Sequence, residues 1–166
     1  EVKVVEEVKS IIANGHYLGL HFDANFYNVT PKDPWVLLVE KEKEILESVF
    51  DAPVHALSFH NPDIGFNWLS VDHEQIAGLY NAYGRTLQKA FTYCSDSNGY
   101  WRYLRLAEVL SNPDVERLHV LTHPGWWMEK SMSPRQRVQH IIDDRARSTG
   151  ERYDRALELG ERQNVR

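Results

Sequence analysis

The feature that most constrains the fold of this chain is the alternation of short apolar segments with helical patterns. Segments of strand length, apolar and compatible with β-structure, cover residues 17–22, 54–59, 91–94 and 118–122. Helical spacing or capping signals indicate helices over residues 2–14, 33–50, 100–110 and 133–161, and residues 75–87 have a partly helical pattern. Strands that alternate with helices pair in parallel through right-handed crossovers. The sequence therefore predicts an α/β fold with a long C-terminal helix.

Capping signals set the expected ends of the helices. Asp33 followed by Pro34 is expected to supply the N-cap and the first residue of the second helix. Ser133 and Pro134 predict the start of the last helix in the same way. Gly150 indicates a break within that helix, because glycine is a poor helix former.

Length and composition fit one domain over residues 1–166 with a substantial core. A net charge of -5 argues against nucleic-acid binding, which usually requires a basic surface. Cys94 is the single cysteine, which excludes an internal disulfide and fits a reducing compartment. No apolar run approaches the roughly 20 residues that span a bilayer. We therefore expect a cytoplasmic protein without a transmembrane segment, and a leader removed before Glu1 stays open.

Each expected strand ends in a residue that can bind a metal or transfer a proton. These residues are His21 with Asp23, then His60, Asp96 and His123. In parallel α/β folds the C-terminal ends of the strands carry the functional site, so these side chains are expected to share one site. Four of them also have an ordinary explanation: Asp23 would cap its loop, His60 and Asp96 would belong to turns, and His21 would bond a carbonyl in the core.

Two kinds of chemistry are suggested by these strand ends. His21 and His60 with a carboxylate such as Asp23 would form a His-His-carboxylate set that suits a catalytic divalent ion, with zinc favoured. Aromatic residues that follow the strand ends suit the flat faces of sugar rings; they include Trp101, Trp126 and Trp127. The alternative is that these aromatic residues only cover the end of the core.

Three segments resemble motifs of the NodB-homology polysaccharide deacetylases. Residues 15–21, GHYLGLH, resemble the family segment GHEIGxH, whose last His binds the metal. Residues 58–62, SFHNP, stand where the family has an Arg-Pro motif at a strand end, and residues 121–124, LTHP, resemble the motif that carries the general acid. With residues 95–101, SDSNGYW, the set resembles a branch associated with bacterial surface-polysaccharide biosynthesis.

The resemblance covers residues 15–127 and implies an incomplete (β/α) barrel that deacetylates an acetylated sugar or polysaccharide precursor. It implies His21 as a metal ligand and His123 as the general acid. The family's second metal-binding His is Asn25 here, so Asp23 and His60 are the remaining candidate ligands. The family's catalytic Asp pair has no counterpart before residue 15, so Asp96 is a candidate general base. A complete barrel takes about 250 residues, and we therefore expect an N-terminally truncated barrel.

Three other functions stay open at this point. A non-catalytic module could bind a glycan through the same aromatic residues. A metal-dependent phosphoesterase would need cationic anchors, and Arg102 is the one cation near an expected strand end. A purely structural partner protein would rest on the long charged C-terminal helix.

Overall fold

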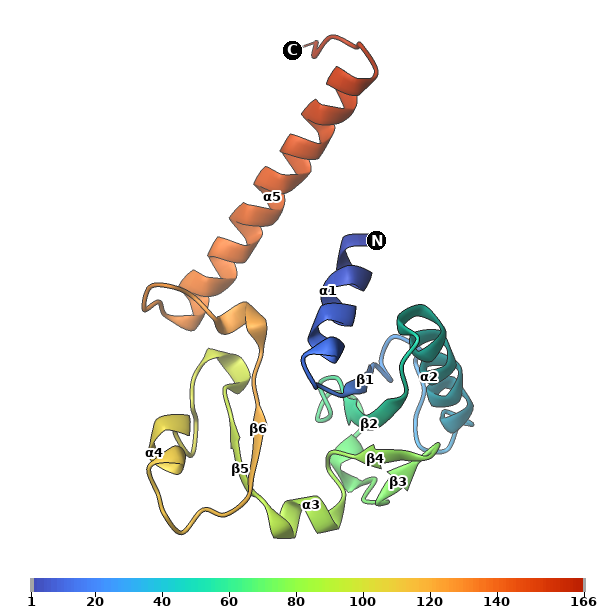
Figure 1. Ribbon diagram of the computed structural model, residues 1–166, viewed down its shortest axis with the longest axis vertical. Coiled ribbons are helices and arrows are strands. Elements are labelled where there is room, and N and C mark those ends of the chain that lie inside the picture. Colours follow the sequence, from blue (N-terminus) through green and yellow to red (C-terminus); the bar gives the residue numbers. More distant parts are fainter. Residues whose placement is uncertain (1, 166) are drawn as a thin grey trace. The chain divides into compact units, whose positions relative to one another are not determined.

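The computed structural model describes residues 2–165, and its contacts divide the chain into two compact units, Glu1–Phe91 and Thr92–Arg166. Figure 1 labels the elements of both. The first unit contains α1 (Val2–Ala13), β1 (Leu18–Phe22), α2 (Val36–Phe50), β2 (Val54–Phe59), β3 (Gln75–Ile76), β4 (Leu79–Asn81) and α3 (Arg85–Ala90). The second contains β5 (Thr92–Ser95), α4 (Leu106–Leu110), β6 (Leu118–Leu121) and α5 (Pro134–Leu159). The expected single domain over residues 1–166 stays a prediction.

The first unit is built on a four-stranded sheet with the order β1-β2-β4-β3. β1 pairs with β2 and β2 with β4 in parallel, and β3 pairs with β4 in antiparallel orientation. Burial alternates along β1, so that Leu20 and Phe22 are buried whereas Gly19 and His21 are exposed. Period-two burial means that one face of this strand packs into the core and the other stays open.

The core of the first unit lies on the α2 side of the sheet. α2 contacts both β1 and β2, and its Val39 is fully buried with Phe22 and Leu57. Four buried aromatic side chains contact one another in this core: Phe22, Trp35, Phe59 and Trp68. Trp68 stacks on Phe59 with ring centroids 5.2 Å apart and meets Trp35 edge-on at 5.1 Å.

Truncating the buried tryptophan should therefore be costly. We expect Trp68→Ala to lower the free energy of unfolding by about 3–5 kcal/mol, because it removes packed aromatic surface and leaves a cavity. Trp127 is the matched control, since 66% of it is exposed, and Trp127→Ala should change stability by no more than about 0.5 kcal/mol. Urea denaturation followed by circular dichroism measures both. Equal losses in the two variants would contradict this view of the core.

The helical pattern expected over residues 75–87 is wrong in its first part. β3 and β4 form a hairpin there, and α3 begins only at Arg85. The two turn residues, Ala77 and Gly78, both have positive φ angles of 52° and 78°. A two-residue turn of this handedness matches the twist of paired strands, and glycine adopts it without strain. The glycine thus marks a hairpin here rather than a weak helix.

Two other helix boundaries differ from the expected ones. Asp33 does not cap α2, because its Oδ2 atom accepts hydrogen bonds from the backbone N–H and the hydroxyl of Thr30 at 2.8 Å each. α2 begins two residues after Pro34, at Val36. The helix expected over residues 100–110 is reduced to Leu106–Leu110. At Asp33 the side-chain turn to Thr30 competes with the first helical turn.

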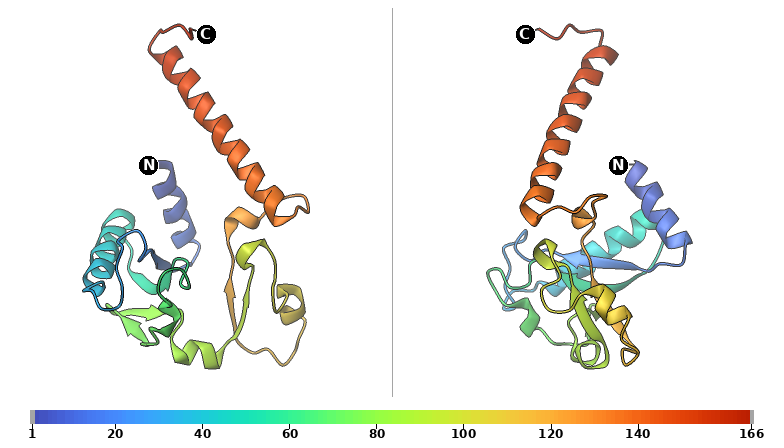
Figure 2. Two further views of the ribbon diagram at one scale, coloured as in Figure 1. Left: turned by 180° about the vertical axis from the view of Figure 1, so that it is seen from behind. Right: turned by 90° about the vertical axis from the view of Figure 1, so that its left-hand side faces the viewer.

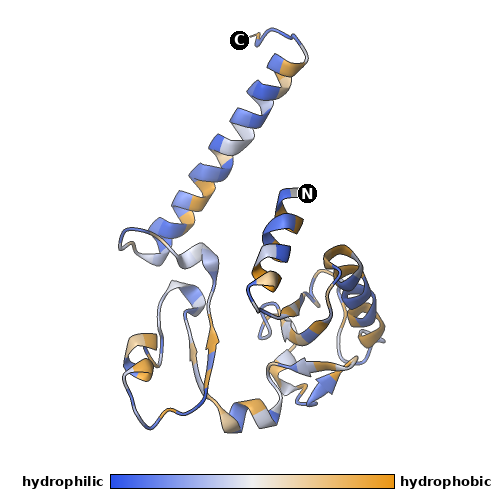
Figure 3. Ribbon diagram, in the orientation of Figure 1, coloured by the Kyte–Doolittle hydropathy of each residue, from blue (hydrophilic) through white to orange (hydrophobic). Residues whose placement is uncertain are grey.

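The second unit contains the parallel pair β5–β6, in which Thr92 lies opposite Leu118 and Ser95 opposite Leu121. α5 begins where expected, with a capping box between Ser133 and Gln136. It runs without interruption to Leu159, so the break expected near Gly150 is absent (Figure 2). Figure 3 shows α5 as mainly hydrophilic.

The α/β class is confirmed. The strands of residues 2–165 form two open sheets, one of four strands and one of two. Across the described residues, no helix is both long enough and apolar enough to span a membrane.

Candidate functional site

The ends of β1 and β2 bring His21 and His60 together. The parallel register places His21 opposite Ser58, and the backbone N–H of His60 donates to the carbonyl of Phe22 at 2.8 Å, which extends the pairing past the strand. The Nε2 atom of His21 lies 3.2 Å from the Nδ1 atom of His60, and the two rings meet edge-on at 88°. The expectation that these two strand-end histidines meet is therefore met by the structure.

Two polar side chains flank the histidine pair, and the sequence analysis did not single them out. The hydroxyl oxygen of Ser58 lies 2.8 Å from Nδ1 of His21, and Nδ2 of Asn61 lies 2.9 Å from Nε2 of His60. Once the register of β1 on β2 is known, it identifies Ser58, because Ser58 lies directly opposite His21. Ser58, His21, His60 and Asn61 form a continuous chain of hydrogen bonds at the C-terminal ends of β1 and β2.

The surroundings of the pair leave it accessible. His21 lies on the open face of the sheet, where its neighbours on β1 and β2 are small: Gly19 stands opposite Ala56. His21 is exposed and His60 is half-buried. A ligand approaching this face would meet imidazole, hydroxyl and amide groups rather than core side chains.

Asp23 serves mainly as a loop cap in this structure. Its Oδ1 atom accepts hydrogen bonds from the backbone N–H groups of Asn25 and Phe26 at 3.0 and 3.1 Å. Over residues 2–165, no three His, Cys, Asp or Glu side chains gather as a set that could hold a metal. The assignment of Asp23 as a metal ligand stays a prediction, with its Oδ2 atom as the donor.

The second unit joins the other two strand-end residues. Asp96 follows β5 and His123 follows β6, and their atoms Oδ1 and Nδ1 are 2.6 Å apart. The Oδ2 atom of Asp96 also accepts a hydrogen bond from the backbone N–H of His123 at 3.1 Å. The Asp96 side chain is only 8% exposed, whereas that of His123 is 45% exposed. A buried carboxylate thus holds an accessible imidazole by its Nδ1 side.

The loop that carries Asp96 is fixed by its own turn and by α5. Asn98 and Gly99 have positive φ angles of 62° and 81°. A side chain at position 99 would meet Pro134 at 2.9 Å, which explains the glycine. Arg137 donates a hydrogen bond to the carbonyl of Gly99 at 3.0 Å and ties the start of α5 to this loop.

Aromatic side chains of the second unit differ in accessibility. Trp127 is 66% exposed and Tyr103 is 86% exposed, whereas Trp101 and Trp126 are half-buried. The guanidinium of Arg102 lies over the rings of Tyr100 and Tyr103 at 5.6 and 6.0 Å. Two buried donors, Nε1 of Trp126 and Nε of Arg137, have no hydrogen-bond partner within the described chain.

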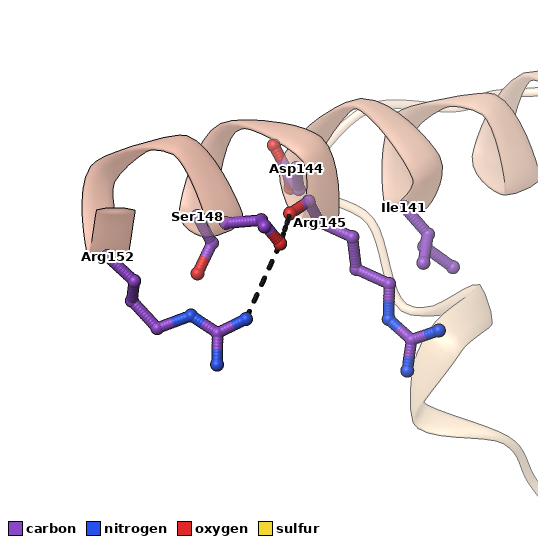
Figure 4. Close-up of a pocket in the computed structure, with 6 residues that line it drawn as sticks. Ile141, Asp144, Arg145, Ser148 and Arg152 are labelled. Atoms are coloured by element: carbon purple, nitrogen blue, oxygen red, sulfur yellow. Dashed lines mark hydrogen bonds between the residues drawn. The ribbon is translucent and has the colours of Figure 1, made fainter. Parts of the chain in front are cut away.

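Other titratable groups lie apart from these two pairs. Burial raises the pKa of the Cys94 thiol, which disfavours the nucleophilic thiolate. Burial lowers the pKa of His119, which faces Tyr93 across the β5–β6 pair. Figure 4 shows a surface hollow on α5 that contains neither pair. Its lining residues are Ile141, Asp144, Arg145, Ser148, Thr149 and Arg152.

Comparison with known proteins gives no family assignment. No protein-family model matches this chain, and neither the curated proteins nor the solved structures contain a match. The features of this chain that bear on function are therefore the two pairs, His21–His60 and Asp96–His123.

Proposed function

We propose that this chain is a metal-dependent hydrolase of the carbohydrate deacetylase type. The observation that carries the proposal is the 3.2 Å separation between Nε2 of His21 and Nδ1 of His60. Two imidazole nitrogens on one tetrahedral zinc ion, each about 2.0–2.1 Å from it, are about 3.3 Å apart. The pair thus has the spacing of two ligands of one ion.

The two histidines fit such an ion in type as well as in spacing, whereas no third His, Cys, Asp or Glu gathers with them within the described residues. His21 and His60 would hold it, and Asp23 is the candidate for a third ligand through Oδ2. Open positions on the ion would then stay available to water and substrate, as in catalytic zinc sites. When bound, a divalent ion of this kind supplies a Lewis acid that activates water and polarises an acyl oxygen.

Proton transfer is assigned to His123. Asp96 accepts the Nδ1–H of its ring, so Nε2 is the nitrogen that can give or take a proton. A carboxylate in this position also stabilises the ring when it is positively charged. His123 would act as the general acid that protonates the leaving amine or sugar oxygen. Both oxygens of Asp96 accept hydrogen bonds from His123. Asp96 is therefore better placed to orient His123 than to act as the general base that takes a proton from water.

The substrate class is an acetylated sugar or polysaccharide precursor. The motif resemblance supports it, as do the exposed aromatic rings at Tyr103 and Trp127. Trp101 and Trp126 are further candidates for contact with sugar rings. The parallel strands β1, β2 and β4, with α2 on one face, fit the proposal of an incomplete (β/α) barrel. A cytoplasmic location stays a prediction.

Metal content and acetate release test the proposal together. We expect the purified chain to carry close to one divalent ion, measured by inductively coupled plasma mass spectrometry. Acetate release from an oligomer of N-acetylglucosamine should stop after treatment with a chelator and return with Zn²⁺. A chain that takes up no ion even after incubation with Zn²⁺ would contradict the proposal.

A glycan-binding module without catalysis is the second candidate. Arg102 holds Tyr100 and Tyr103 in a small aromatic surface that is 50% exposed at Tyr100 and 86% exposed at Tyr103. Such a surface suits stacking against sugar rings without any metal. Binding of the same oligomer that is unaffected by the chelator, without acetate release, would favour this candidate.

A further inference from the structure

The charged residues of α5 are separated around the helix. Arginines at positions 145, 152 and 155 are seven and three residues apart, and this spacing places them on one face of an α-helix. The acidic residues of α5 share a separate stripe, because they too are spaced mainly by three, four or seven residues; they are Asp143, Asp144, Glu151, Asp154 and Glu158. The long helix thus has a basic face and an acidic stripe.

The acidic stripe is paired with an arginine that does not belong to the basic face. Arg147 lies within the stripe, where its guanidinium approaches Asp144 at 2.7 Å and Glu151 at 3.9 Å. Asp144 lines the hollow on α5, but its carboxylate is therefore already engaged. Arg145 and Arg152 form no ion pair with any acidic side chain of residues 2–165. Two positive charges on the basic face are thus left without a counter-charge from the described chain.

The hollow drawn in Figure 4 lies on this basic face. Arg145 and Arg152 extend to the same side of α5, with Ser148 between them (Figure 4). Their backbones are two turns apart, about 10.5 Å along the helix axis. The hydroxyls of Ser148 and Thr149 lie at the midpoint, and the Thr149 hydroxyl accepts a hydrogen bond from Nη2 of Arg152 at 3.4 Å. This contact directs the Arg152 guanidinium back toward the midpoint.

The hollow is built on a helix that is held firmly at its start. Ile141, at the inner end of the hollow, packs over the backbone of Gly125, and Arg137 donates to the carbonyl of Gly99 at 3.0 Å. From there α5 runs without interruption to Leu159. The spacing of its two arginines is therefore fixed by the helix, which favours binding of a ligand with several acceptor atoms.

A phosphate group matches this arrangement best. Each guanidinium presents a planar fork of N–H donors that fits two oxygens of a carboxylate or a phosphate. One such fork occupies both oxygens of a carboxylate, whereas the tetrahedral phosphate has oxygens for two forks and for a hydroxyl donor. A phosphate monoester also has a charge of about −1.5 to −2 at pH 7, which balances the two arginines.

We propose that Arg145, Ser148 and Arg152 form a binding site for a phosphate group on α5. The two guanidinium groups hold the phosphate oxygens from both sides, and the exposed Ser148 hydroxyl donates to it from below. The site shares no residue with the His21–His60 or Asp96–His123 pairs. It therefore goes beyond the proposed function and does not depend on it.

The test is a titration of the full chain with inorganic phosphate at low salt, followed by proton–nitrogen NMR in the presence of a chelator. We expect saturable shifts at the arginine Nε–H groups and at the backbone amides of residues 145–152. Arg145→Gln and Arg152→Gln should each weaken binding at least about tenfold, because each removes a charge-assisted pair of hydrogen bonds. Arg135→Gln is the matched control, since Arg135 is an exposed arginine of α5 outside the basic face, and it should bind like the wild type.

Three comparisons separate recognition of phosphate from attraction of any anion. Arg152→Lys keeps the charge but loses the planar fork, so it should bind more weakly than the wild type. Acetate should bind at least about tenfold more weakly than phosphate. Methyl phosphate distinguishes the sources of the group: tighter binding than that of inorganic phosphate indicates a phosphorylated ligand, and weaker binding indicates free phosphate.

Three results would overturn the inference: no saturable shifts with either phosphate, an equal loss of affinity in Arg135→Gln, or acetate bound as tightly as phosphate. Circular dichroism checks that α5 stays helical in each variant. Because the chelator removes divalent ions, phosphate bound to a metal cannot imitate this result. Failure of the phosphate site leaves the proposed hydrolase standing, and failure of metal binding leaves the phosphate site standing.

Discussion

Asp96→Asn should lower the rate of acetate release by about 100- to 10,000-fold, with the effect mainly on kcat. The wild-type carboxylate accepts the Nδ1–H of His123 at 2.6 Å and is itself almost fully buried. An Asn side chain can instead donate to Nδ1, which moves the ring proton to Nε2 and removes the charge that stabilises the protonated ring. Steady-state kinetics on an N-acetylglucosamine oligomer measures the loss, and circular dichroism checks that the chain remains folded.

Further variants separate a loss of catalysis from a loss of folding in Asp96→Asn. His123→Ala should lose about as much activity as Asp96→Asn, and the double variant should lose little more, because the two residues act as one unit. Asp114→Asn removes an exposed carboxylate from the same unit and should keep full activity. Where Asp96→Asn unfolds, His123→Gln serves in its place, since the His123 side chain is 45% exposed. Full activity in a folded Asp96→Asn chain would remove the pair from the mechanism.

The parts of the fold that the sequence predicted are those with strong local signals. β2 was expected over residues 54–59 and is Val54–Phe59, and α5 begins at its expected cap and proline. Short apolar segments predicted the positions of the strands, and Ser133 with Pro134 predicted the start of the last helix. The same reasoning placed His21 and His60 at neighbouring strand ends, because parallel strands end at one edge of a sheet.

Three kinds of feature could not be predicted from the sequence: very short strands, a local side-chain turn, and contacts between residues far apart in the chain. The β3–β4 hairpin has strands of two and three residues, too short for a periodic signal. Asp33 looked like a helix cap but bonds Thr30, three residues earlier. Ser58 and Asn61 became visible as site residues only through the register of β1 on β2 and the side-chain contacts of the two histidines. A register between strands 37 residues apart cannot be derived from local pattern alone.

His21→Ala should abolish metal binding while leaving the fold intact. Removing one of two imidazole ligands should weaken zinc binding by at least about 100-fold, more than the loss of a side chain that only hydrogen-bonds to a ligand. His21 is exposed on the open face of the sheet, so the free energy of unfolding in the absence of metal should change by no more than about 0.5 kcal/mol. Metal content by mass spectrometry and zinc titration measure the first effect, and urea denaturation in chelator measures the second.

The matched control for this variant is another exposed histidine at the opposite end of the same strand. His16 precedes β1, has no side-chain contact among the hydrogen bonds and ring pairs of the described residues, and is exposed. His16→Ala should keep wild-type metal content, whereas His60→Ala should lose the ion as His21→Ala does. Loss in all three would indicate general surface binding by histidines. Retention of a full equivalent of metal in His21→Ala would show that the ion, and with it the chemistry assigned to β1 and β2, lies elsewhere in the chain.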